Sequence, residues 1–398
     1  MKIAVLGLGK QGWACALDLL REPDVEGLLL LDADGPALER ARERFGSDAR
    51  VRIETVDAAD ESALAARLSG IDVVASAVPY FLNLGVTKAA IRARCSMTDM
   101  GGNTEVVFQQ RSLDEKAKEA GIAVVPDLGL APGLGNILAA HAIEGMDPVE
   151  EVRIRCGGLP LEPEGPLGYA LFFSIHGLLN EYSGESVCLR EGRIARIPTL
   201  TEGEWIRFPE PVGLCRAMHT SGGTSTLPWT LEGRVRRLDY KTVRYPGHWP
   251  KIRFLKSLGM LDTRPARFGR VTLPPREIAA SLLQTMLDRP EVRDVVVLRV
   301  TARGRHGDHF LSRRFDVLEV GDPFPGASAM MKLTAFPTAA VALALARRTI
   351  QAKGVLAAES AVDAKAMLSH LGRRGIAVTV EETTRHGGSK GGSEPGGA

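Results

Sequence analysis

A glycine-rich segment near the start of the chain has the spacing of a phosphate-binding turn. Gly7, Gly9 and Gly12 lie in the pattern GLGKQG, which follows an apolar run and opens a helical pattern. In that context the first glycine permits a tight turn, the second lets the backbone approach a pyrophosphate, and the third lets helix and strand pack closely. The free N–H groups of the helix would face the anion. The pattern predicts a dinucleotide site, with Lys10 and Gln11 at its variable positions.

An acidic residue at the end of the second apolar run bears on the choice of coenzyme. Asp32 stands where a carboxylate accepts hydrogen bonds from the adenine ribose 2′-hydroxyl, and its charge repels a 2′-phosphate. The next residues, Ala33, Asp34 and Gly35, offer no arginine for that phosphate. We therefore expect NAD rather than NADP. Asp57, after the third run, is a candidate for the adenine amino group, although a turn carboxylate explains it equally well.

Two further loops are expected to border the nicotinamide. In such a domain the nicotinamide lies over the carboxyl ends of the strands, near the point where the strand order reverses. The loop after the fourth apolar run contains Ala77, Val78, Pro79 and Tyr80, and the loop after the fifth contains Asp99. From position alone, we expect Tyr80 to contact the substrate and the other four to contact the coenzyme.

A second group of chemically capable residues lies between positions 219 and 248. The segments TSGGTSTLP (220–228) and YKTVRYPGH (240–248) bring His219, Lys241, Arg244 and His248 close in sequence. The guanidinium of Arg244 matches a carboxylate in geometry and charge, so we predict that it binds a substrate carboxylate. The alternative is that these are ordinary charges on exposed strands.

The group that moves the proton is left open. His219 and His248 can exchange a proton near neutral pH, and Lys241 could do so if burial lowered its pKa. These three residues are the candidate catalytic groups, although a structural hydrogen bond explains either histidine equally well. Asp127, at the end of a predicted strand, could hold an ammonium group. Thr242 is a further candidate substrate contact.

Other titratable residues are weaker candidates. His176 and Glu181, in the segment SIHGLLNEY, are interpreted as helix-capping and surface groups. His306 and His309 lie in a polar loop, but no third ligand has a fitting spacing. We therefore predict no metal site.

The elements that must position these residues follow from hydrophobic patterning. From position 2 to about 145, short apolar runs alternate with amphipathic stretches, which predicts a doubly wound, Rossmann-type parallel sheet with helices on both faces. From about position 149, segments with alternating polar faces predict an inserted α+β domain with a mixed or antiparallel sheet. Helical periodicity returns at 335–352 and 361–372, and we expect these turns to pack on the first domain.

These patterns predict four regions. They are an NAD-binding Rossmann domain (1–135), a substrate-binding and dimerisation α+β domain (136–328), a C-terminal segment that returns to the Rossmann domain (329–385), and a disordered low-complexity tail (386–398).

Composition narrows the class of protein. The 398 residues carry 50 Lys and Arg against 48 Asp and Glu, so the net charge of +2 gives no overall field for nucleic acid or a membrane surface. Five cysteines without a CxxC pair suggest a reducing compartment. No stretch approaches the roughly 18 apolar residues of a spanning helix. We expect a soluble cytoplasmic protein, and the exposed sheet edges of its second domain favour a homodimer.

Three longer motifs carry a resemblance to a known family. They are DLGLAPG (127–133), TSGGTS (220–225) and KTVRYPGH (241–248). With the terminal helices they make the chain resemble the saccharopine dehydrogenase (saccharopine reductase) family, most closely its L-lysine 6-dehydrogenase branch. Ala131 stands where saccharopine reductases usually carry Asp, which favours that branch. The resemblance implies a Rossmann domain, an inserted domain for substrate and dimerisation, and Arg244 at the substrate.

The resemblance also implies a reaction class. We expect an NAD-dependent oxidoreductase acting on a CH–NH₂ or CH–NH bond of a basic amino acid, with L-lysine 6-dehydrogenation as the first expectation. Saccharopine dehydrogenase and carboxynorspermidine- or homospermidine-forming enzymes are the nearest alternatives. A protein that binds NAD for regulation without turnover is the alternative from another class.

Overall fold

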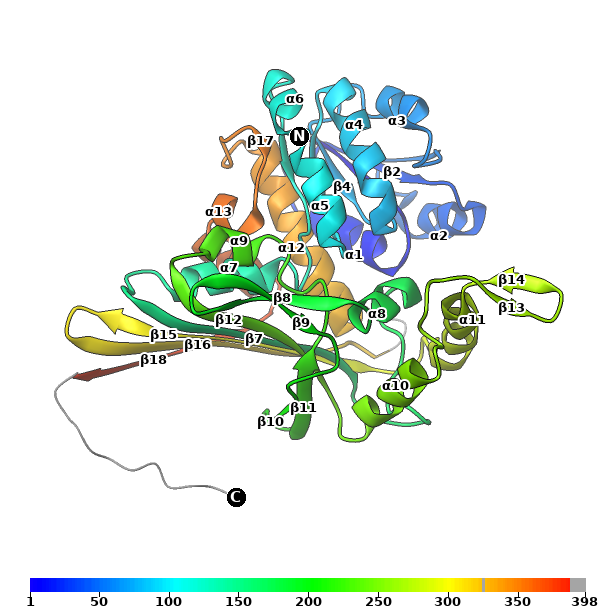
Figure 1. Cartoon of the computed structure of the whole chain (residues 1–398). Coiled ribbons are helices and arrows are strands. Elements are labelled where there is room, and N and C mark those ends of the chain that lie inside the picture. Colours follow the sequence, from blue (N-terminus) through cyan, green and yellow to red (C-terminus); the bar gives the residue numbers. More distant parts are fainter. Residues whose placement is uncertain (324–325, 387–398) are drawn as a thin grey trace.

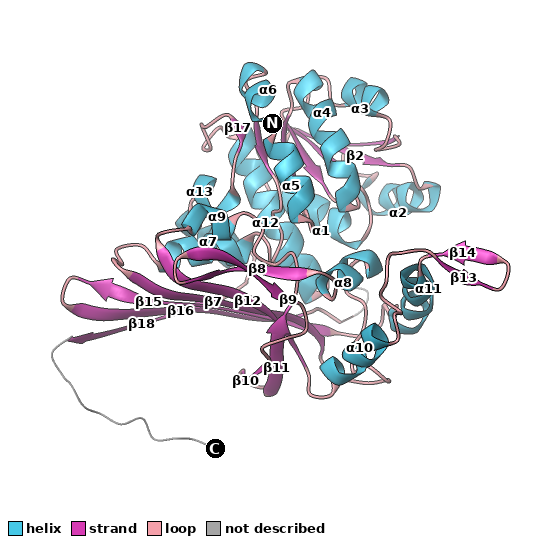
Figure 2. Cartoon of the chain, in the orientation of Figure 1, coloured by secondary structure: helices cyan, strands magenta, loops and turns pink. Residues whose placement is uncertain are grey.

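A computed structural model describes residues 1–323 and 326–386 of the chain. Figure 1 shows an α/β unit, coloured mostly blue and cyan, above a long second sheet that carries its own helices. Figure 2 shows that helices lie between the two sheets, so the interior of the molecule lies between the two layers of strands.

The first sheet is parallel throughout. Its seven strands have the order β17-β6-β5-β4-β1-β2-β3. The central strands are buried on both faces because crossover helices cover both sides of a parallel sheet. This arrangement confirms the predicted doubly wound, Rossmann-type fold. The strands are β1 (Lys2–Leu6), β2 (Gly27–Asp32), β3 (Val51–Thr55), β4 (Val73–Ser76), β5 (Ser96–Asp99), β6 (Ala123–Val125) and β17 (Gly354–Val355).

The crossover helices begin at side-chain caps that the sequence encodes. Asp34, Asp60 and Asn103 each accept hydrogen bonds from backbone N–H groups in the first turn of the following helix, which otherwise lack partners. The helices of this unit are α1 (Lys10–Leu19), α2 (Gly35–Phe45), α3 (Glu61–Arg67), α4 (Asn83–Ala93), α5 (Thr104–Arg111) and α6 (Asp114–Glu119), with a short 3₁₀ helix, η1 (Tyr80–Leu82).

The second sheet is mixed, as the sequence predicted. Its main order is β10-β11-β12-β7-β15-β16-β18, and β8 pairs with both β12 and β9. β12 runs parallel to β7, while the other pairs are antiparallel. The strands are β7 (Val149–Pro160), β8 (Glu185–Arg190), β9 (Arg193–Pro198), β10 (Glu204–Arg207), β11 (Leu214–His219), β12 (Val235–Arg244), β15 (Asp294–His306), β16 (His309–Val320) and β18 (Val378–His386).

The remaining helices lie on the second sheet, at its end, or between it and the first domain. They are α7 (Leu134–Ala142), α8 (Ile175–Glu181), α9 (Leu227–Leu231), α10 (His248–Ser257), α11 (Pro275–Leu287), α12 (Ala329–Ala346), α13 (Ala358–Ala361) and α14 (Ala364–Arg373). A small hairpin of β13 (Ala266–Phe268) and β14 (Val271–Leu273) projects from the body beyond α11 (Figure 1).

The two faces of β12 have different surroundings. Leu238 and Tyr240 belong to the apolar cluster that includes Ile137 of α7 and Leu333 of α12. Val243 belongs to a separate cluster with residues of β11 and β15. Because successive side chains of a strand point to opposite faces, even-numbered residues of β12 face the helices and the first domain. From Asp239 onward the odd-numbered residues face away, whereas Val235, at the start of the strand, belongs to the same apolar cluster as Leu238.

The C-terminal segment divides between the two sheets. α12 lies against α1, and β17 extends the first sheet next to β6. β18 instead pairs with β16 at the edge of the second sheet. This placement differs from the expectation that the whole segment 329–385 returns to the first domain. The expected tail, apart from His386, lies outside the described residues.

The helix α12 corrects one expectation about apolar stretches. It has 18 residues with a mean hydropathy of 1.5, which is enough by length and composition to cross a membrane. However, 72% of it is buried inside the protein, where it packs against α1 and β15. Its apolar character on all sides is therefore that of a core helix.

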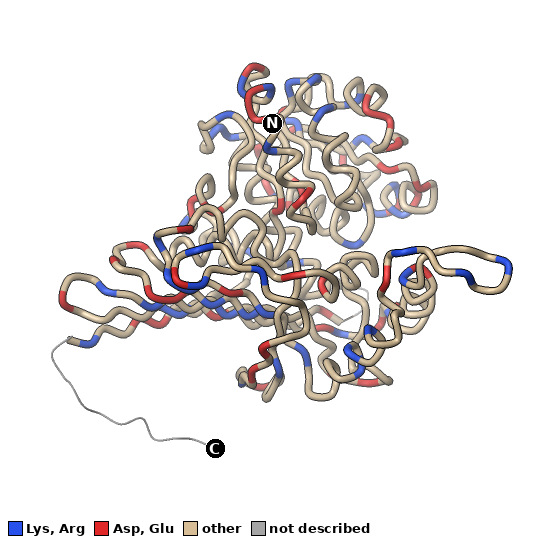
Figure 3. Tube along the Cα trace, viewed as in Figure 1, with Lys and Arg blue, Asp and Glu red and all other residues tan. Residues whose placement is uncertain are grey.

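Charges of both signs are interspersed over the surface. Figure 3 shows Lys and Arg alternating with Asp and Glu along the second sheet rather than gathering in one patch of a single sign. Many form neighbouring pairs across strands, such as Arg299 with Asp316 and Arg313 with Glu382. This distribution agrees with the near-zero net charge.

Candidate active site

The turn after β1 has the close approaches that its glycines suggest. Gly7 has φ +90°, and a Cβ there would lie 2.9 Å from the carbonyl of Ala77. A Cβ at Gly12 would lie 1.7 Å from the Gly7 oxygen. A Cβ at Gly9 would have no neighbour within 4 Å. Gly7 and Gly12 are therefore required by the fold, whereas Gly9 leaves an open approach to the backbone, as a pyrophosphate needs.

Polar groups around this turn fit a dinucleotide. Both amide atoms of Gln11 are buried without a hydrogen-bond partner among residues 1–323 and 326–386. An amide in this state calls for a polar ligand. Lys10 reaches across to the second domain, with Nζ 3.4 Å from Asp288 Oδ1. Together with the open approach at Gly9, these groups are suited to hold a pyrophosphate.

The carboxylate of Asp32 is fixed by the same turn. Its Oδ2 accepts from the Leu8 N–H at 2.5 Å, and its Oδ1 accepts from the Asp34 N–H at 2.9 Å. Asp32 is only partly buried, so further lone pairs can accept from ribose hydroxyls. Asp57 is exposed and accepts from the Ala59 N–H at 2.9 Å, which is the turn role considered as its alternative.

The loop after β4 lies beside the turn. The Ala77 N–H donates to the Leu6 carbonyl at 2.7 Å, which carries Val78 and Pro79 past Gly7. Tyr80 opens η1, and its ring lies 3.9 Å from the position of a Cβ built at Gly102. The structure thus places the two predicted loops next to each other at the carboxyl edge of the sheet.

Asp99 supports this edge from inside. It is fully buried, its Oδ2 accepts from Gln110 Nε2 at 2.8 Å, and its Oδ1 accepts from the Asp127 N–H at 3.1 Å. Burial, and then repulsion from Asp127, raises the pKa of Asp99 to about 7. Full burial does not fit the predicted coenzyme contact, and Asp99 instead positions the backbone of Asp127.

Asp127 is held in a strained position at the end of β6. It has φ +56°, and its Oδ1 accepts from the Gly102 N–H at 2.7 Å. A Cβ at Gly101 would lie 1.6 Å from that oxygen, so the double glycine is required there. Burial raises the pKa of Asp127 to about 6, against the lowering effect of the Ser225 hydroxyl. Its Oδ2 accepts no hydrogen bond from any described residue.

Arg244, at the end of β12, is on the face toward the first domain. It is 2% exposed, its Nη2 lies 3.0 Å from Glu181 Oε2, and its Cζ lies 4.7 Å from the centre of the Tyr169 ring. Its Nε has no acceptor among the described residues. A desolvated guanidinium with an unused donor is suited to a carboxylate ligand.

Glu181 corrects the interpretation of this residue as a surface group. Its side chain is 22% exposed and pairs with Arg244. Burial raises the pKa of Glu181, and the positive charge of Arg244 opposes that rise. Neither Glu181 nor Tyr169 lies in a motif with Arg244, so local spacing carried no signal for this pairing.

His248 lies near Arg244 but both of its ring nitrogens are engaged. Nδ1 lies 3.1 Å from the Leu167 carbonyl oxygen, and Nε2 lies 3.0 Å from the Tyr182 hydroxyl. Burial, and then the charge of Arg244, lowers the pKa of His248 to about 3. The ring is therefore neutral, donates from Nδ1 to the carbonyl and accepts at Nε2 from the tyrosine. In this arrangement it anchors α10.

His219 and Lys241 lie on the other face of the sheet. They are paired in register across β11 and β12, and Lys241 has an odd position on its strand. His219 Nε2 lies 3.1 Å from Glu202 Oε2 and Nδ1 lies 3.3 Å from Ser186 Oγ. Lys241 Nζ donates to the Glu202 carbonyl at 2.7 Å. Strand alternation turns both side chains away from Arg244, so these two candidate catalytic residues do not share a site with it.

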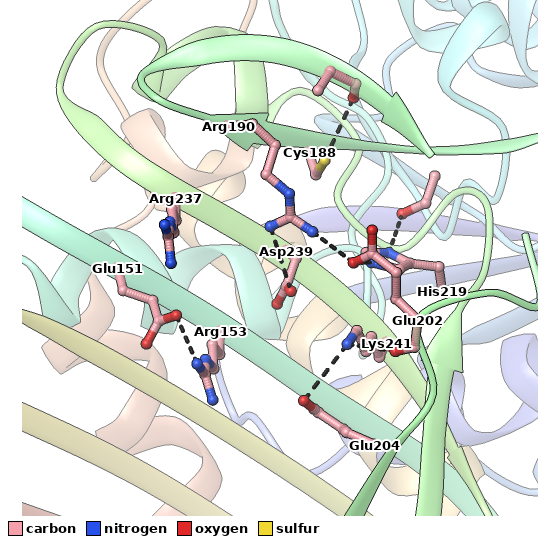
Figure 4. A network of polar contacts seen from close by, with 12 residues as sticks. Glu151, Arg153, Cys188, Arg190, Glu202, Glu204, His219, Arg237, Asp239 and Lys241 are labelled. Atoms are coloured by element: carbon pink, nitrogen blue, oxygen red, sulfur yellow. Dashed lines mark hydrogen bonds and ion pairs between the residues drawn. The ribbon is translucent and has the colours of Figure 1, made fainter. Parts of the chain in front are cut away.

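These two residues belong to a separate network of charges. Figure 4 shows His219 and Lys241 beside Glu202 and Glu204, with Asp239 on the same strand as Lys241. Burial lowers the pKa of His219, although the charge of Asp239 opposes this change. Arg155 pairs with Asp239 at 2.6 Å and also with Glu204. The charged groups of this network pair with one another, and Arg155 Nη2 alone among its buried nitrogens has no acceptor in the described residues.

Thr242 joins β12 to the loop that carries TSGGTS. Its Oγ1 lies 2.6 Å from Thr220 Oγ1 and 3.2 Å from the Tyr240 hydroxyl. A Cβ at Gly223 would lie 2.2 Å from the Tyr240 ring, so the loop can lie flat on that ring only as glycine. Asn180 Nδ2 donates to the Gly102 carbonyl at 3.2 Å and connects α8 to the first domain. Arg244, Thr242 and Asp127 thus lie along one boundary between the two domains, which we call the seam.

Two family models match consecutive parts of the chain. Residues 3–125 match the saccharopine dehydrogenase NADP binding domain, and residues 129–376 match the saccharopine dehydrogenase C-terminal domain. The boundary between the two matched regions lies at residues 126–128 and includes Asp127.

Curated relatives share limited identity. Saccharopine dehydrogenase [NADP(+), L-glutamate-forming] of Saccharomyces cerevisiae is 27% identical over 217 residues, which cover 52% of this chain and 48% of the relative. Mitochondrial alpha-aminoadipic semialdehyde synthase of Mus musculus is 25% identical over 395 residues, which cover 82% and 42%. The chain spans about half the length of the curated relatives it matches.

Solved structures share the fold over nearly the whole chain. Apo saccharopine dehydrogenase (L-Glu forming) from Saccharomyces cerevisiae has a TM-score of 0.76 at 20% identity, with 96% of this chain and 99% of that chain covered. Homospermidine synthase from Legionella pneumophila, in complex with NAD, has a TM-score of 0.67 at 11% identity, with 99% and 94% covered. With both of its domains matched in order, the chain belongs to the saccharopine dehydrogenase family.

Proposed function

We propose that the protein is an NAD-dependent oxidoreductase that oxidatively deaminates the side-chain amine of a basic amino acid, with L-lysine as substrate. The observation that carries this proposal is the pair of Arg244 and Glu181 at the seam between the domains. A guanidinium and a carboxylate side by side complement the α-carboxylate and α-ammonium of an amino acid. The side chain of the substrate would then extend toward the carboxyl edge of the first sheet.

The overall reaction balances with water as the only further reactant. A nicotinamide coenzyme bound at the turn would accept the hydride, so that R–CH₂–NH₃⁺, NAD⁺ and H₂O give R–CHO, NH₄⁺, NADH and H⁺. For lysine the aldehyde would cyclise onto its own α-amine. The residues of the chain have to orient the amine, remove its proton and admit water.

Asp127 is the group best placed to handle the amine. Its Oδ1 is fixed by the Gly102 N–H, and its Oδ2 is left to accept from a ligand. With a pKa of about 6 it is ionised in alkaline buffer, where an amine also loses its proton more readily. His248 is neutral with both nitrogens engaged, so it serves to support the site rather than to exchange protons.

The coenzyme preference is proposed from Asp32. The matching family model is named for NADP, and the yeast relative carries NADP(+) in its name. In this chain Asp32 is the last residue of β2, and the next three residues include no arginine. A negative charge at this position repels a 2′-phosphate. Titration with NAD and NADP tests the proposal, and tighter binding of NADP would overturn it.

A second candidate, saccharopine dehydrogenase, is favoured by one observation. Arg216 of β11 is the register partner of Arg244, and its Nε has no acceptor among the described residues. Saccharopine carries two more carboxylates than lysine, so a neighbouring cation would suit it. The guanidinium of Arg216 lies 5.4 Å from the centre of the Trp205 ring, at the end of the sheet.

The test is the formation of NADH at 340 nm in alkaline buffer. L-Lysine, L-saccharopine and carboxynorspermidine are compared, each with NAD and with NADP. Reduction of NAD by lysine alone, with a product aldehyde that cyclises, supports the proposal. Reaction with saccharopine alone overturns the substrate and favours the second candidate. Coenzyme binding without reaction of any amine favours a regulatory protein.

A further inference from the structure

Three buried oxygen atoms close to the seam have no hydrogen-bond donor. They are Asp127 Oδ2, Asn136 Oδ1 and Glu359 Oε2, and no residue within 1–323 or 326–386 donates to them. Their side chains are 2%, 1% and 8% exposed. They come from the end of β6, from α7 and from α13, which are distant in sequence.

One short loop connects all three side chains. The Thr224 carbonyl accepts from Asn136 Nδ2 at 2.8 Å, and the Thr226 hydroxyl donates to Glu359 Oε1 at 2.8 Å. The same loop also reaches the turn that holds Asp127: a Cβ built at Gly222 would lie 3.7 Å from the carbonyl oxygen of Gly102, whose N–H donates to Asp127. The Ser225 hydroxyl, further along this loop, lowers the pKa of Asp127. The charge of Glu359 also acts on Asp127, whose pKa it raises. The consecutive residues Thr224, Ser225 and Thr226, at the end of the TSGGTS segment and just after it, therefore bring the three side chains into one neighbourhood.

The free atoms of this neighbourhood are all acceptors. Asn136 uses its amide nitrogen on the Thr224 carbonyl, so its oxygen is what remains. Glu359 uses Oε1 on the Thr226 and Thr230 hydroxyls, so Oε2 remains. Buried acceptors are costly unless a donor satisfies them. Two carboxylate oxygens and one amide oxygen match a cation that donates three hydrogen bonds.

The ligand set does not favour a divalent metal ion. Calcium takes six to eight oxygen ligands, and residues 1–323 and 326–386 contain no group of three or more His, Cys, Asp or Glu side chains that could hold a metal ion. A primary ammonium group has three N–H donors, one for each of the three oxygens. The site also adjoins the turn at Gly102, which Asp127 fixes beside Tyr80.

We propose that Asp127, Asn136 and Glu359 form a binding site for an ammonium nitrogen, which holds the amine of the substrate and then the ammonium ion that is released. This inference rests on the proposed function for its biological role, because a deaminating enzyme must bind that nitrogen before and after the reaction. Its binding chemistry does not depend on which amine is oxidised.

The direct test uses Rb⁺, an ammonium-sized cation with an anomalous X-ray signal, soaked into crystals without coenzyme or amine. An anomalous peak is expected among the three oxygens, and an excess of ammonium chloride should displace it. In Glu359→Gln, which puts an amide N–H₂ in place of an acceptor, the peak should be lost. The control Glu144→Gln, on an exposed residue paired with His141, should keep it. Absence of the peak in the native protein, or its persistence in Glu359→Gln, would overturn the proposal.

A second readout does not need crystals. The new amide of Glu359→Gln can donate to the free oxygens of Asp127 or Asn136, so this variant should have a higher Tm than the native protein in ammonium-free buffer. Ammonium chloride should raise the Tm of the native protein, relative to sodium chloride, and leave that of Glu359→Gln unchanged. Equal responses of the two proteins to ammonium would contradict the site.

Kinetics distinguish the two sources of the nitrogen. In the reductive direction, the KM for free ammonium should rise at least about tenfold in Glu359→Gln while the KM for NADH stays the same. A rise in the KM for lysine but not for ammonium would assign the site to the substrate amine alone. If no amine is oxidised but Rb⁺ binds, the proposed function fails and the site stands. If lysine is oxidised while Rb⁺ does not bind, only this inference fails.

Discussion

At the scale of the residue, Arg244 is the most informative position. Its guanidinium contacts both the Tyr169 ring and the Glu181 carboxylate, and its Nε has no acceptor among the described residues. Sequence reasoning could select Arg244, because a planar cation in the KTVRYPGH motif suggests a carboxylate ligand. It could not find Glu181 or Tyr169, because these reach Arg244 only through tertiary packing.

The substitution Arg244→Lys tests the role of this guanidinium. Lysine keeps the charge but cannot form two parallel hydrogen bonds with a carboxylate. We expect the KM for lysine to rise at least about tenfold, equivalent to about 1.4 kcal/mol of binding, with kcat reduced by less than about threefold. Steady-state kinetics measure both values, and the Kd of NAD serves as the control for folding. Unchanged kinetics would refute the role.

His248 gives a prediction about the pH dependence of stability. Its folded-state pKa of about 3 lies below its ordinary value near 6.5, so the unfolded chain binds the extra proton between these values. The stability that neutral His248 provides is thus present above about pH 6.5 and is lost as the pH falls toward 3. Urea unfolding should show a smaller loss between pH 6.5 and 4.5 in His248→Gln than in the native protein. Equal losses in the two proteins would contradict the buried, neutral assignment.

At the scale of the element, the strand β12 explains why the residues predicted to form one catalytic group do not lie together. Lys241 and Arg244 are three positions apart, so strand alternation places them on opposite faces. The alternation of side chains between the two faces of a strand, applied to this sequence, is enough to separate Lys241 from Thr242 and Arg244. The partners of Lys241 could not be predicted, because Glu202 and Glu204 belong to a loop and strand that the hydrophobic pattern did not reveal.

The glycines of the first turn make a matched pair of variants. Gly12→Ala would bring a Cβ to 1.7 Å from the Gly7 oxygen, so we expect this variant to fold poorly or to have a much lower Tm than the native protein. Gly9→Ala meets no neighbour within 4 Å, so its Tm should match that of the native protein. Its Kd for NAD should rise at least about tenfold, because the methyl group would occupy the approach of the pyrophosphate. Calorimetry of both variants checks this, and normal NAD binding by Gly9→Ala would contradict the site.

At the scale of the whole molecule, the C-terminal segment is fastened to the first domain by a buried ionic cluster. Asp18 of α1 is fully buried and pairs with His370 at 2.7 Å and with Arg374. The helical periodicity at the end of the chain predicted that these helices exist, but only tertiary structure shows that α14 meets α1 through charges. The expected homodimer stays a prediction. Among the described residues, β9, β10 and β18 are the outer strands of the second sheet.

Asp18→Asn tests how much this cluster contributes. It leaves His370 and Arg374 without their buried counter-charge, and removing one partner of a buried pair costs about 3 kcal/mol or more. Urea unfolding should show that loss of the free energy of unfolding. The control Glu39→Gln removes an exposed pair with Arg42 and should change stability by less than about 1 kcal/mol. Equal effects of the two substitutions would mean that the C-terminal segment is held by apolar packing alone.

The most direct test of where the substrate binds is a crystal structure of the complex with NADH and L-lysine. We predict the pyrophosphate at the turn containing Gly9, the α-carboxylate of lysine on Arg244, its α-ammonium on Glu181, and its side-chain nitrogen near Asp127. Lysine bound on the opposite face of the sheet, beside His219 and Lys241, would contradict the account. So would an amino acid bound at the seam without any contact to Arg244.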